Sequence, residues 1–167
     1  MTDRTILKDR DAKPLIEDLR RLPNQQSLTH KARVEIENVK DSEIVFVDGV
    51  AIAFRKKGEL IPVLTNKMAL DSMPRIVVDM GAVPHVAGGA DIMAPGIREI
   101  TDSVSEKHLL VVVDEKHGKY LAVGRALLDA GAMRGTRHGK VVTNVHYVGD
   151  LIWEVIKPKG QSSTSSN

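Results

Sequence analysis

The chain has 167 residues and contains no cysteine. Disulfide frameworks, thiolate zinc fingers, iron–sulfur clusters and cysteine nucleophiles are therefore excluded. Aromatic residues are also scarce, with two Phe, two Tyr and one Trp. So few rings argue against a nucleic-acid module that stacks bases on a sheet of aromatic side chains. No purely aliphatic run exceeds the length of residues 109–113, whereas a membrane span needs about 20 residues, so we expect no membrane partner.

An excess of charge of one sign is lacking as well, because 24 Lys and Arg stand against 22 Asp and Glu. No basic arm or acidic tail stands out. The opening residues 1–4 lead into a charged segment and not into the apolar core of a signal peptide. We therefore expect a cytoplasmic protein. The length suits one medium domain or two small ones.

Residues 1–74 predict a small α+β domain that opens with a helix. Leu15, Leu19 and Leu22 recur at the spacing of one helical face. Pro14 is expected in the first turn, where its missing N–H would have no helical partner. Pro23 is expected to end the helix, because the residue before a proline avoids the helical region.

Strands are expected after this helix. Four short apolar segments have the length and pattern of strands: 34–36, 43–47, 50–54 and 60–64. The pair Asp48-Gly49 predicts a type I′ hairpin turn, because both central residues of that turn need a positive φ. Thr65 is expected to cap a short helix that carries Met68 and Leu70.

Residues 75–157 predict mostly short strands. The expected strands are 75–78, 109–114, 120–123, 140–146 and 151–156, and one helix is expected over 82–88. Tyr147 and Trp153 are expected to be buried on the last strands, with His146 hydrogen-bonded internally. Many short strands with one or two helices favour a small barrel-like β domain. The polar residues 158–167 predict a flexible tail.

A glycine-rich motif follows the first of these later strands, over residues 77–97. Gly81 would let the strand turn sharply into the helix, and Gly88-Gly89 would end the helix with positive φ. Spacing alone also fits turn glycines in a compact domain. No G-x-G-x-x-G is present, so the motif is not a dinucleotide fingerprint.

The order of strand, Asp-x-Gly-Ala-Val, short helix and Gly-Gly-Ala-Asp-Ile-Met-Ala-Pro-Gly-Ile resembles the signature of the PUA domain. This RNA-binding module is found with pseudouridine synthases and archaeosine transglycosylases. Residues 121–126 and 138–142 agree with it in order and spacing. Residues 144–153 are similar to a subfamily of archaeal and eukaryotic proteins related to malignant T-cell-amplified sequence protein and ligatin. In that subfamily a pre-PUA domain precedes the PUA domain.

The resemblance implies an α+β chain of two domains and a tail. A pre-PUA α+β domain would occupy 1–74, a PUA β pseudo-barrel with short helices 75–157, and a flexible tail 158–167. Pro84-His85 and the glycine-rich loop 131–137 depart from the usual PUA pattern. Both departures could alter the affinity for RNA without altering the fold.

RNA binding in a groove between the short helix and the flanking strands is also implied by the resemblance. The residues carried over by the motif are Gly81, Ala82, His85, Gly88, Gly89, Ala90, Asp91, Met93, Pro95 and Gly96. A groove of small residues offers its backbone to phosphates and 2′-hydroxyls, which suits recognition of shape. Bulky residues in place of Gly89 or Ala90 are expected to block RNA and to leave the fold intact.

Basic residues crowd the stretch 125–140. Arg134, Arg137, His138 and Lys140, together with Arg125, would form a phosphate-facing patch if the loop folds back toward the groove. A solvated loop is an equally good interpretation. The run Arg55-Lys56-Lys57 has the same two interpretations: a solubilised turn, or a second contact surface.

The sequence shows no motif of a catalytic site or of a cofactor site. The six histidines do not form a helical metal-binding pattern. Residues 135–141 only faintly resemble a phosphate-binding loop, since Arg134 stands where its first glycine should be and Val141 replaces the magnesium-binding Ser or Thr. Asp114 and Glu115 would point to opposite faces of a strand. We therefore expect a non-enzyme without a metal or a cofactor.

Three functions remain open at this point. The first is a translation-associated factor that engages tRNA, rRNA or the small ribosomal subunit, together with a translation-factor protein partner. The second is an RNA-targeting subunit for a separate tRNA- or rRNA-modifying enzyme. The third is a protein-interaction adaptor. Binding to RNA would separate the first two from the third.

Overall fold

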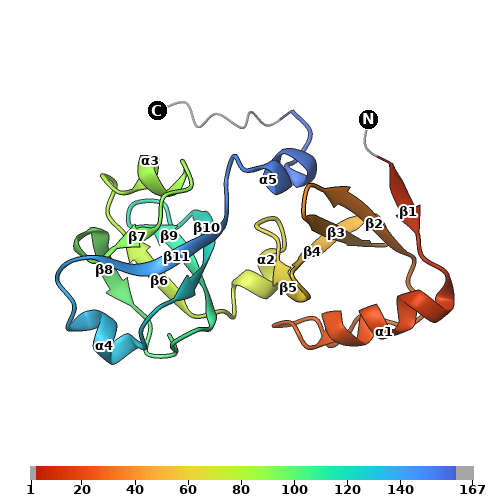
Figure 1. Cartoon of the computed structure of the whole chain (residues 1–167), viewed down its shortest axis with the longest axis horizontal. Coiled ribbons are helices and arrows are strands. Elements are labelled where there is room, and N and C mark those ends of the chain that lie inside the picture. The colour runs from red at the N-terminus through yellow and green to blue at the C-terminus, as the bar shows by residue number, and fades with distance from the viewer. Residues whose placement is uncertain (1–2, 161–167) are drawn as a thin grey trace. The chain divides into compact units, whose positions relative to one another are not determined.

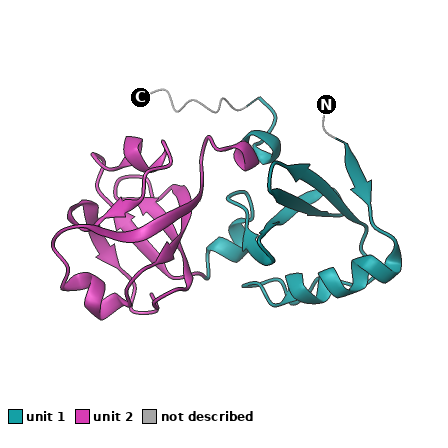
Figure 2. Ribbon diagram, viewed as in Figure 1, with its two compact units in different colours: residues 1–72, 154–161 teal, residues 73–153, 162–167 magenta. Residues whose placement is uncertain are grey.

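The structure, a computed structural model, describes residues 3–160. Within that range the chain forms two compact units (Figure 2). Residues 3–72 together with 154–160 make the first unit, and residues 73–153 make the second. Figure 1 labels the helices and strands of both. None of the helices in this range is long and apolar enough to cross a membrane.

The first unit is built on a five-stranded antiparallel sheet. Its strands pair in chain order: β1 (Arg4–Ile6), β2 (Val34–Val39), β3 (Ser42–Val47), β4 (Val50–Lys56) and β5 (Glu59–Pro62). The predicted hairpin at Asp48-Gly49 is confirmed, with φ of 49° and 83° at the two residues. Lys57-Gly58 repeats this geometry between β4 and β5, with φ of 50° and 79°. Tight turns therefore fix the register of the strands β3 to β5, whereas α1 lies between β1 and β2.

Helix α1 (Asp9–Arg20) covers one face of the first sheet. Leu15 and Leu19 are buried against the sheet as predicted, whereas Leu22 lies beyond the helix and is only partly buried. Pro14 is not in the first turn, because the helix begins five residues earlier, at Asp9. Acidic residues in that first turn favour the helix N-terminus, and this signal outweighs the proline. Helix α2 (Lys67–Leu70) is capped by Asn66 and not by Thr65.

The second unit is a curled six-stranded sheet. Its order is β7 (Ile92–Met93), β11 (Lys140–Tyr147), β10 (Tyr120–Ala126), β9 (Leu109–Asp114), β6 (Arg75–Val78) and β8 (Ile97–Ile100). The pair β6–β9 is parallel, and the others are antiparallel. Register shifts interrupt several of the antiparallel pairs, and such bulges bend a sheet. The α+β class and the barrel-like sheet are confirmed.

Three short helical segments join these strands. They are α3 (Val83–Val86), the 3₁₀ segment η1 (Ala94–Gly96) and α4 (Ala130–Arg134). Helix α3 is shorter than the predicted 82–88, but Pro84 lies in its first turn, as expected. Of the pair Gly88-Gly89, Gly89 has the expected positive φ, at 91°, and Gly88 does not. The prediction of a loop over 131–137 is partly wrong, because residues 131–134 belong to α4. The Asp129 carboxylate caps that helix by accepting a hydrogen bond of 2.8 Å from Ala132 N.

The segment 151–156 is the helix α5 (Leu151–Ile156) and not the predicted strand. Gly149, at φ of 102°, turns the chain out of β11. The Asp150 carboxylate then accepts a hydrogen bond of 2.7 Å from the backbone N–H of Trp153 and another of 3.0 Å from that of Tyr147. Periodicity leaves this short apolar run ambiguous between a strand and a helix, and capping by Asp150 favours the helix. Trp153 is buried as predicted, but on a helix.

The same carboxylate holds His146, which is fully buried. His146 Nδ1 lies 2.8 Å from Asp150 Oδ2, so the predicted internal hydrogen bond is confirmed. Burial of Asp150 raises its pKa, but the hydrogen bond and charge of His146 and the two backbone N–H groups outweigh burial and lower the pKa below its ordinary value of 3.8. Asp150 is therefore ionised at neutral pH. Residues 161–167 of the predicted tail lie outside the described residues.

Candidate functional site

A groove of about 800 Å³ opens on the second unit beside α3, β7 and η1. Figure 1 labels α3 and β7. Its lining residues are Asp79, Gly81, Ala82, His85, Val86, Ala90, Asp91, Ile92, Met93, Pro95, Gly96 and Lys140. Nine of the residues predicted to contact RNA are among them: Gly81, Ala82, His85, Ala90, Asp91, Met93, Pro95, Gly96 and Lys140. The fold thus brings most of the predicted set to one place. Their contact with RNA stays a prediction.

The start of α3 is held by Asp79. Its Oδ1 accepts a hydrogen bond of 2.8 Å from Ala82 N, and its Oδ2 lies 3.9 Å from Arg98 Nη2. The backbone N–H of Asp79 donates in turn to Gly96 O at 2.9 Å. These contacts join the entrance of the helix to the end of η1. Both walls of the groove at this end are therefore fixed by one residue.

The loop after α3 is held by Gly89 and Asn144. A Cβ on Gly89 would lie 2.7 Å from Cζ of Tyr147, and the φ of 91° also disfavours a side chain. Asn144 Nδ2 donates to Val86 O at 3.1 Å and to Ala90 O at 3.0 Å. The expectation that a bulky residue at Gly89 leaves the fold intact is therefore wrong, because Gly89 permits close packing. Ala90 is exposed and still suits that test.

Asn144 holds the loop beside the groove, and no sequence motif points to this role. The one sequence signal is its type, since asparagine is disfavoured inside a strand and stands here among β-formers in β11. Its backbone N–H also donates to Asp91 Oδ1 at 2.8 Å. The other oxygen of Asp91 lies 3.4 Å from Lys140 Nζ. Asp91 therefore ties β11 to the loop and pairs with the one lysine of the groove lining.

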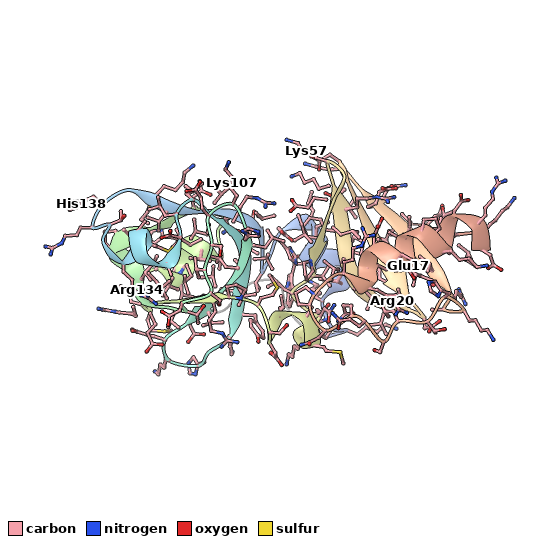
Figure 3. All side chains as sticks on the ribbon, turned by 90° about the horizontal axis from the view of Figure 1, so that it is seen from below. Glu17, Arg20, Lys57, Lys107, Arg134 and His138 are labelled. Atoms are coloured by element: carbon pink, nitrogen blue, oxygen red, sulfur yellow. The ribbon has the colours of Figure 1, made fainter. Side chains whose placement is uncertain are left out.

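The predicted basic patch is dispersed. Arg134 donates to Ile100 O at 2.6 Å and pairs with Asp102 at 2.5 Å, beside a separate hollow of about 540 Å³ next to β8 and α4. Arg125 donates to Lys107 O at 2.9 Å. Arg137 and His138 are exposed, and His138 lies at the outer edge of the second unit in Figure 3. Of the predicted cations, Lys140 alone lines the groove.

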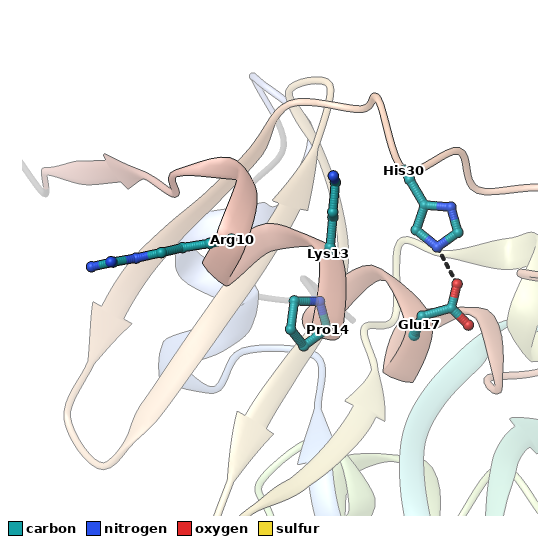
Figure 4. Close-up of a pocket in the computed structure, with 5 residues that line it drawn as sticks. All are labelled: Arg10, Lys13, Pro14, Glu17 and His30. Atoms are coloured by element: carbon teal, nitrogen blue, oxygen red, sulfur yellow. Dashed lines mark hydrogen bonds and ion pairs between the residues drawn. The ribbon is translucent and has the colours of Figure 1, made fainter.

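A further hollow, of about 520 Å³, lies on the first unit along α1. His30 Nε2 contacts Glu17 Oε1 there, while Arg10 and Lys13 extend away from this pair (Figure 4). The side chains do not converge on a common point, so the hollow has no site geometry. Across residues 3–160 no group of three His, Asp or Glu side chains is placed to hold a metal ion.

The comparisons with known proteins agree with this architecture. Residues 74–148 match the PUA domain, and residues 3–66 match a domain of unknown function, DUF1947. The fold is thus that of a PUA-domain protein with a second, N-terminal domain. An uncharacterized protein of Methanocaldococcus jannaschii is 44% identical over 126 residues, which are 74% of this chain and 76% of that protein. The chain therefore belongs to the same family as this relative. Within the chain, the PUA domain follows the DUF1947 region.

Named eukaryotic proteins are more distant relatives. Translation machinery-associated protein 20 of Saccharomyces cerevisiae is 29% identical over 149 residues, 84% of this chain and 80% of that protein. Malignant T-cell-amplified sequence 2 of Homo sapiens is 30% identical over 120 residues, 68% and 66% of the two chains. The crystal structure of a hypothetical protein from Pyrococcus horikoshii has a TM-score of 0.76 at 33% identity and covers 92% of this chain and 99% of its own. The predicted resemblance is confirmed.

Proposed function

We propose that this protein binds RNA through the groove and acts in translation, by engaging tRNA or the small ribosomal subunit. The carrying observation is the convergence of nine motif residues, from the segment 81–96 and from β11, on one groove. The name of the S. cerevisiae relative supports the link to the translation machinery. A cytoplasmic location and a protein partner from that machinery go with this proposal.

The composition of the groove favours recognition of shape. Gly81, Ala82, Ala90 and Gly96 carry little or no side chain, so a sugar–phosphate backbone can approach the protein backbone closely. Asp91 is paired with Lys140, and Asp79 with Arg98. The carboxylates of the groove are therefore partly neutralised and do not repel an RNA strand as free charges would.

The test is binding of the purified protein to tRNA with and without its 3′-terminal nucleotides, and to small ribosomal subunits, at two salt concentrations. Salt-sensitive binding that needs the tRNA end or the subunit supports the proposal. Absence of binding to all of them overturns it and favours the protein-interaction adaptor. Co-purification with a modification enzyme in place of ribosomal subunits would favour the RNA-targeting subunit.

A further inference from the structure

The turn between β9 and β10, residues 115–119, carries three exposed basic side chains. They are Lys116, His117 and Lys119. Neither lysine is paired with a carboxylate in the part of the chain that the structure describes. We refer to residues 115–119 as the basic turn.

Asp114 organises the basic turn from beneath. It is buried, and its Oδ1 accepts hydrogen bonds from the backbone N–H groups of Lys116 at 2.9 Å and His117 at 2.5 Å. Its Oδ2 accepts a third from Lys119 N at 3.0 Å. Burial of Asp114 raises its pKa, but these three backbone hydrogen bonds outweigh burial and lower the pKa below its ordinary value of 3.8. The turn is thus pre-formed at neutral pH.

Glu115 joins the basic turn to the groove. Its backbone N–H donates to Val78 O at 2.9 Å, and its Oε1 accepts from Met80 N at 3.4 Å. Its Oε2 lies 3.4 Å from Arg98 Nε, and Arg98 also contacts Asp79, which lines the groove. The basic turn therefore begins at the Asp79 end of the groove, whereas Lys140 lines the groove from β11.

Charge is segregated across this corner. Three carboxylates and three cations lie here: Asp79, Asp114 and Glu115, and Arg98, Lys116 and Lys119. The carboxylates face partners within the protein, whereas the two lysines face solvent. Asp114 is 3% exposed and faces backbone N–H groups, and Glu115 and Asp79 face Arg98. The two lysines lie in the exposed part of the turn without such partners. A polyanion that approaches from solvent therefore meets the cations first.

We propose that the basic turn extends the groove as a phosphate-binding rim, where Lys116, His117 and Lys119 contact the backbone of RNA that leaves the groove at its Asp79 end. This inference rests on the proposed function. It adds a charged surface to a groove whose own lysine is already paired. It also explains how a chain of small net charge can hold RNA, since the cations lie where the strand emerges.

The test is the double variant Lys116→Gln/Lys119→Gln, measured with unfractionated tRNA over a range of salt concentrations. The backbone N–H groups that Asp114 binds remain, so the turn keeps its shape. We expect binding about tenfold weaker at low salt, which is about 1.4 kcal/mol. The slope of log affinity against log salt should fall by about 1.4 for a single-stranded contact, because two phosphate contacts are lost. Thermal unfolding of the variant checks that the fold is intact.

The matched control is Lys13→Gln/Lys31→Gln, which removes the same charge from exposed positions of the first unit. We expect it to bind close to wild type. If the two double variants weaken binding equally, the effect is one of net charge and the rim is overturned. If wild type and the Lys116/Lys119 variant bind alike while a groove variant loses binding, the rim is wrong and the proposed function stands. If wild type itself does not bind, both fail.

A second variant, Asp114→Asn, tests the organisation of the turn. It removes a negative charge, so net charge alone predicts tighter binding. The asparagine amide can accept hydrogen bonds only through its oxygen. Its NH₂ group would face either Lys119 N–H or the N–H groups of Lys116 and His117, and two donors cannot form a hydrogen bond. We expect weaker binding than wild type, in a variant whose second unit still unfolds cooperatively. Tighter binding would contradict the organised rim.

Discussion

The two sheets of this molecule are connected in different ways. In the first unit each strand pairs with its neighbour in the chain, from β1 to β5. In the second, β7 pairs with β11 and β6 with β9, across long separations in sequence. The groove lies where such a long-range pairing brings the segment 79–96 beside Lys140. Local turns therefore set most of the first sheet, from β2 to β5, while close packing between distant segments sets the site.

The comparison predicts that glycines of the two sheets matter for different reasons, and Gly124 should give the largest effect. A Cβ at this position would lie 2.5 Å from Val142 Cγ1 and 3.0 Å from Thr143 O. We expect Gly124→Ala to lower the free energy of unfolding of the second unit by about 3 kcal/mol, through overpacking. Urea denaturation measures it.

The control for Gly124 is Gly49→Ala in the first sheet. Nothing lies within 4 Å of a Cβ there, and the cost comes from the φ of 83° alone. We expect a loss of about 1–2 kcal/mol. Equal losses at the two positions would contradict the distinction between packing and turn geometry.

Gly89 should give the next effect, because it combines both reasons. Gly89→Ala is expected to destabilise the second unit by about 2 kcal/mol, from the positive φ and the contact with the Tyr147 ring. Adding Tyr147→Ala should restore part of the loss caused by the alanine at 89, since the ring that it meets is gone. Strict additivity in this double-mutant cycle would show that the ring does not matter.

Protonation of Asp150 in acid should lower the free energy of unfolding of the second unit by less than these substitutions do. The pKa of Asp150 is lowered in the folded chain, so its carboxylate stabilises the fold fully above its unfolded value of 3.8. That contribution is lost as the pH falls from 3.8 through the folded pKa. In Asp150→Asn this part of the pH dependence should be absent. An unchanged acid profile of Asp150→Asn, in urea titrations at several pH values, would contradict the assignment. The matched comparison is Asp129→Asn, which removes the cap of α4.

Much of this fold follows from local signals. The Asp48-Gly49 turn, the strands 75–78 and 109–114 and the apolar face of α1 are all predicted by periodicity or turn chemistry. Helix α5 is not, since six apolar-rich residues fit either a strand or a helix until Asp150 caps them. Strand β1 is also missed, because its exposed residues show no alternation of apolar and polar side chains.

The candidate site was predictable to the extent that it is one continuous motif. Residues 81–96 reach the groove together because they are close in sequence. Closeness in sequence also predicts a single patch for the basic residues 134, 137 and 138. The structure separates them, because Arg134 lies on α4 and contacts Ile100 and Asp102. Asn144 and the basic turn lie far from the motif in sequence, and only the sheet pairing brings them to it.

The most direct test of the account compares Ala90→Phe with Ala132→Phe. Both alanines are exposed, but Ala90 lines the groove and Ala132 lies on α4. We expect both variants to unfold within about 0.5 kcal/mol of wild type, as surface substitutions do. Their binding to tRNA at low salt should differ: Ala90→Phe should lose it by tenfold or more, which is about 1.4 kcal/mol, and Ala132→Phe should keep it. If Ala90→Phe binds tRNA as wild type does, the groove is not where this protein holds RNA.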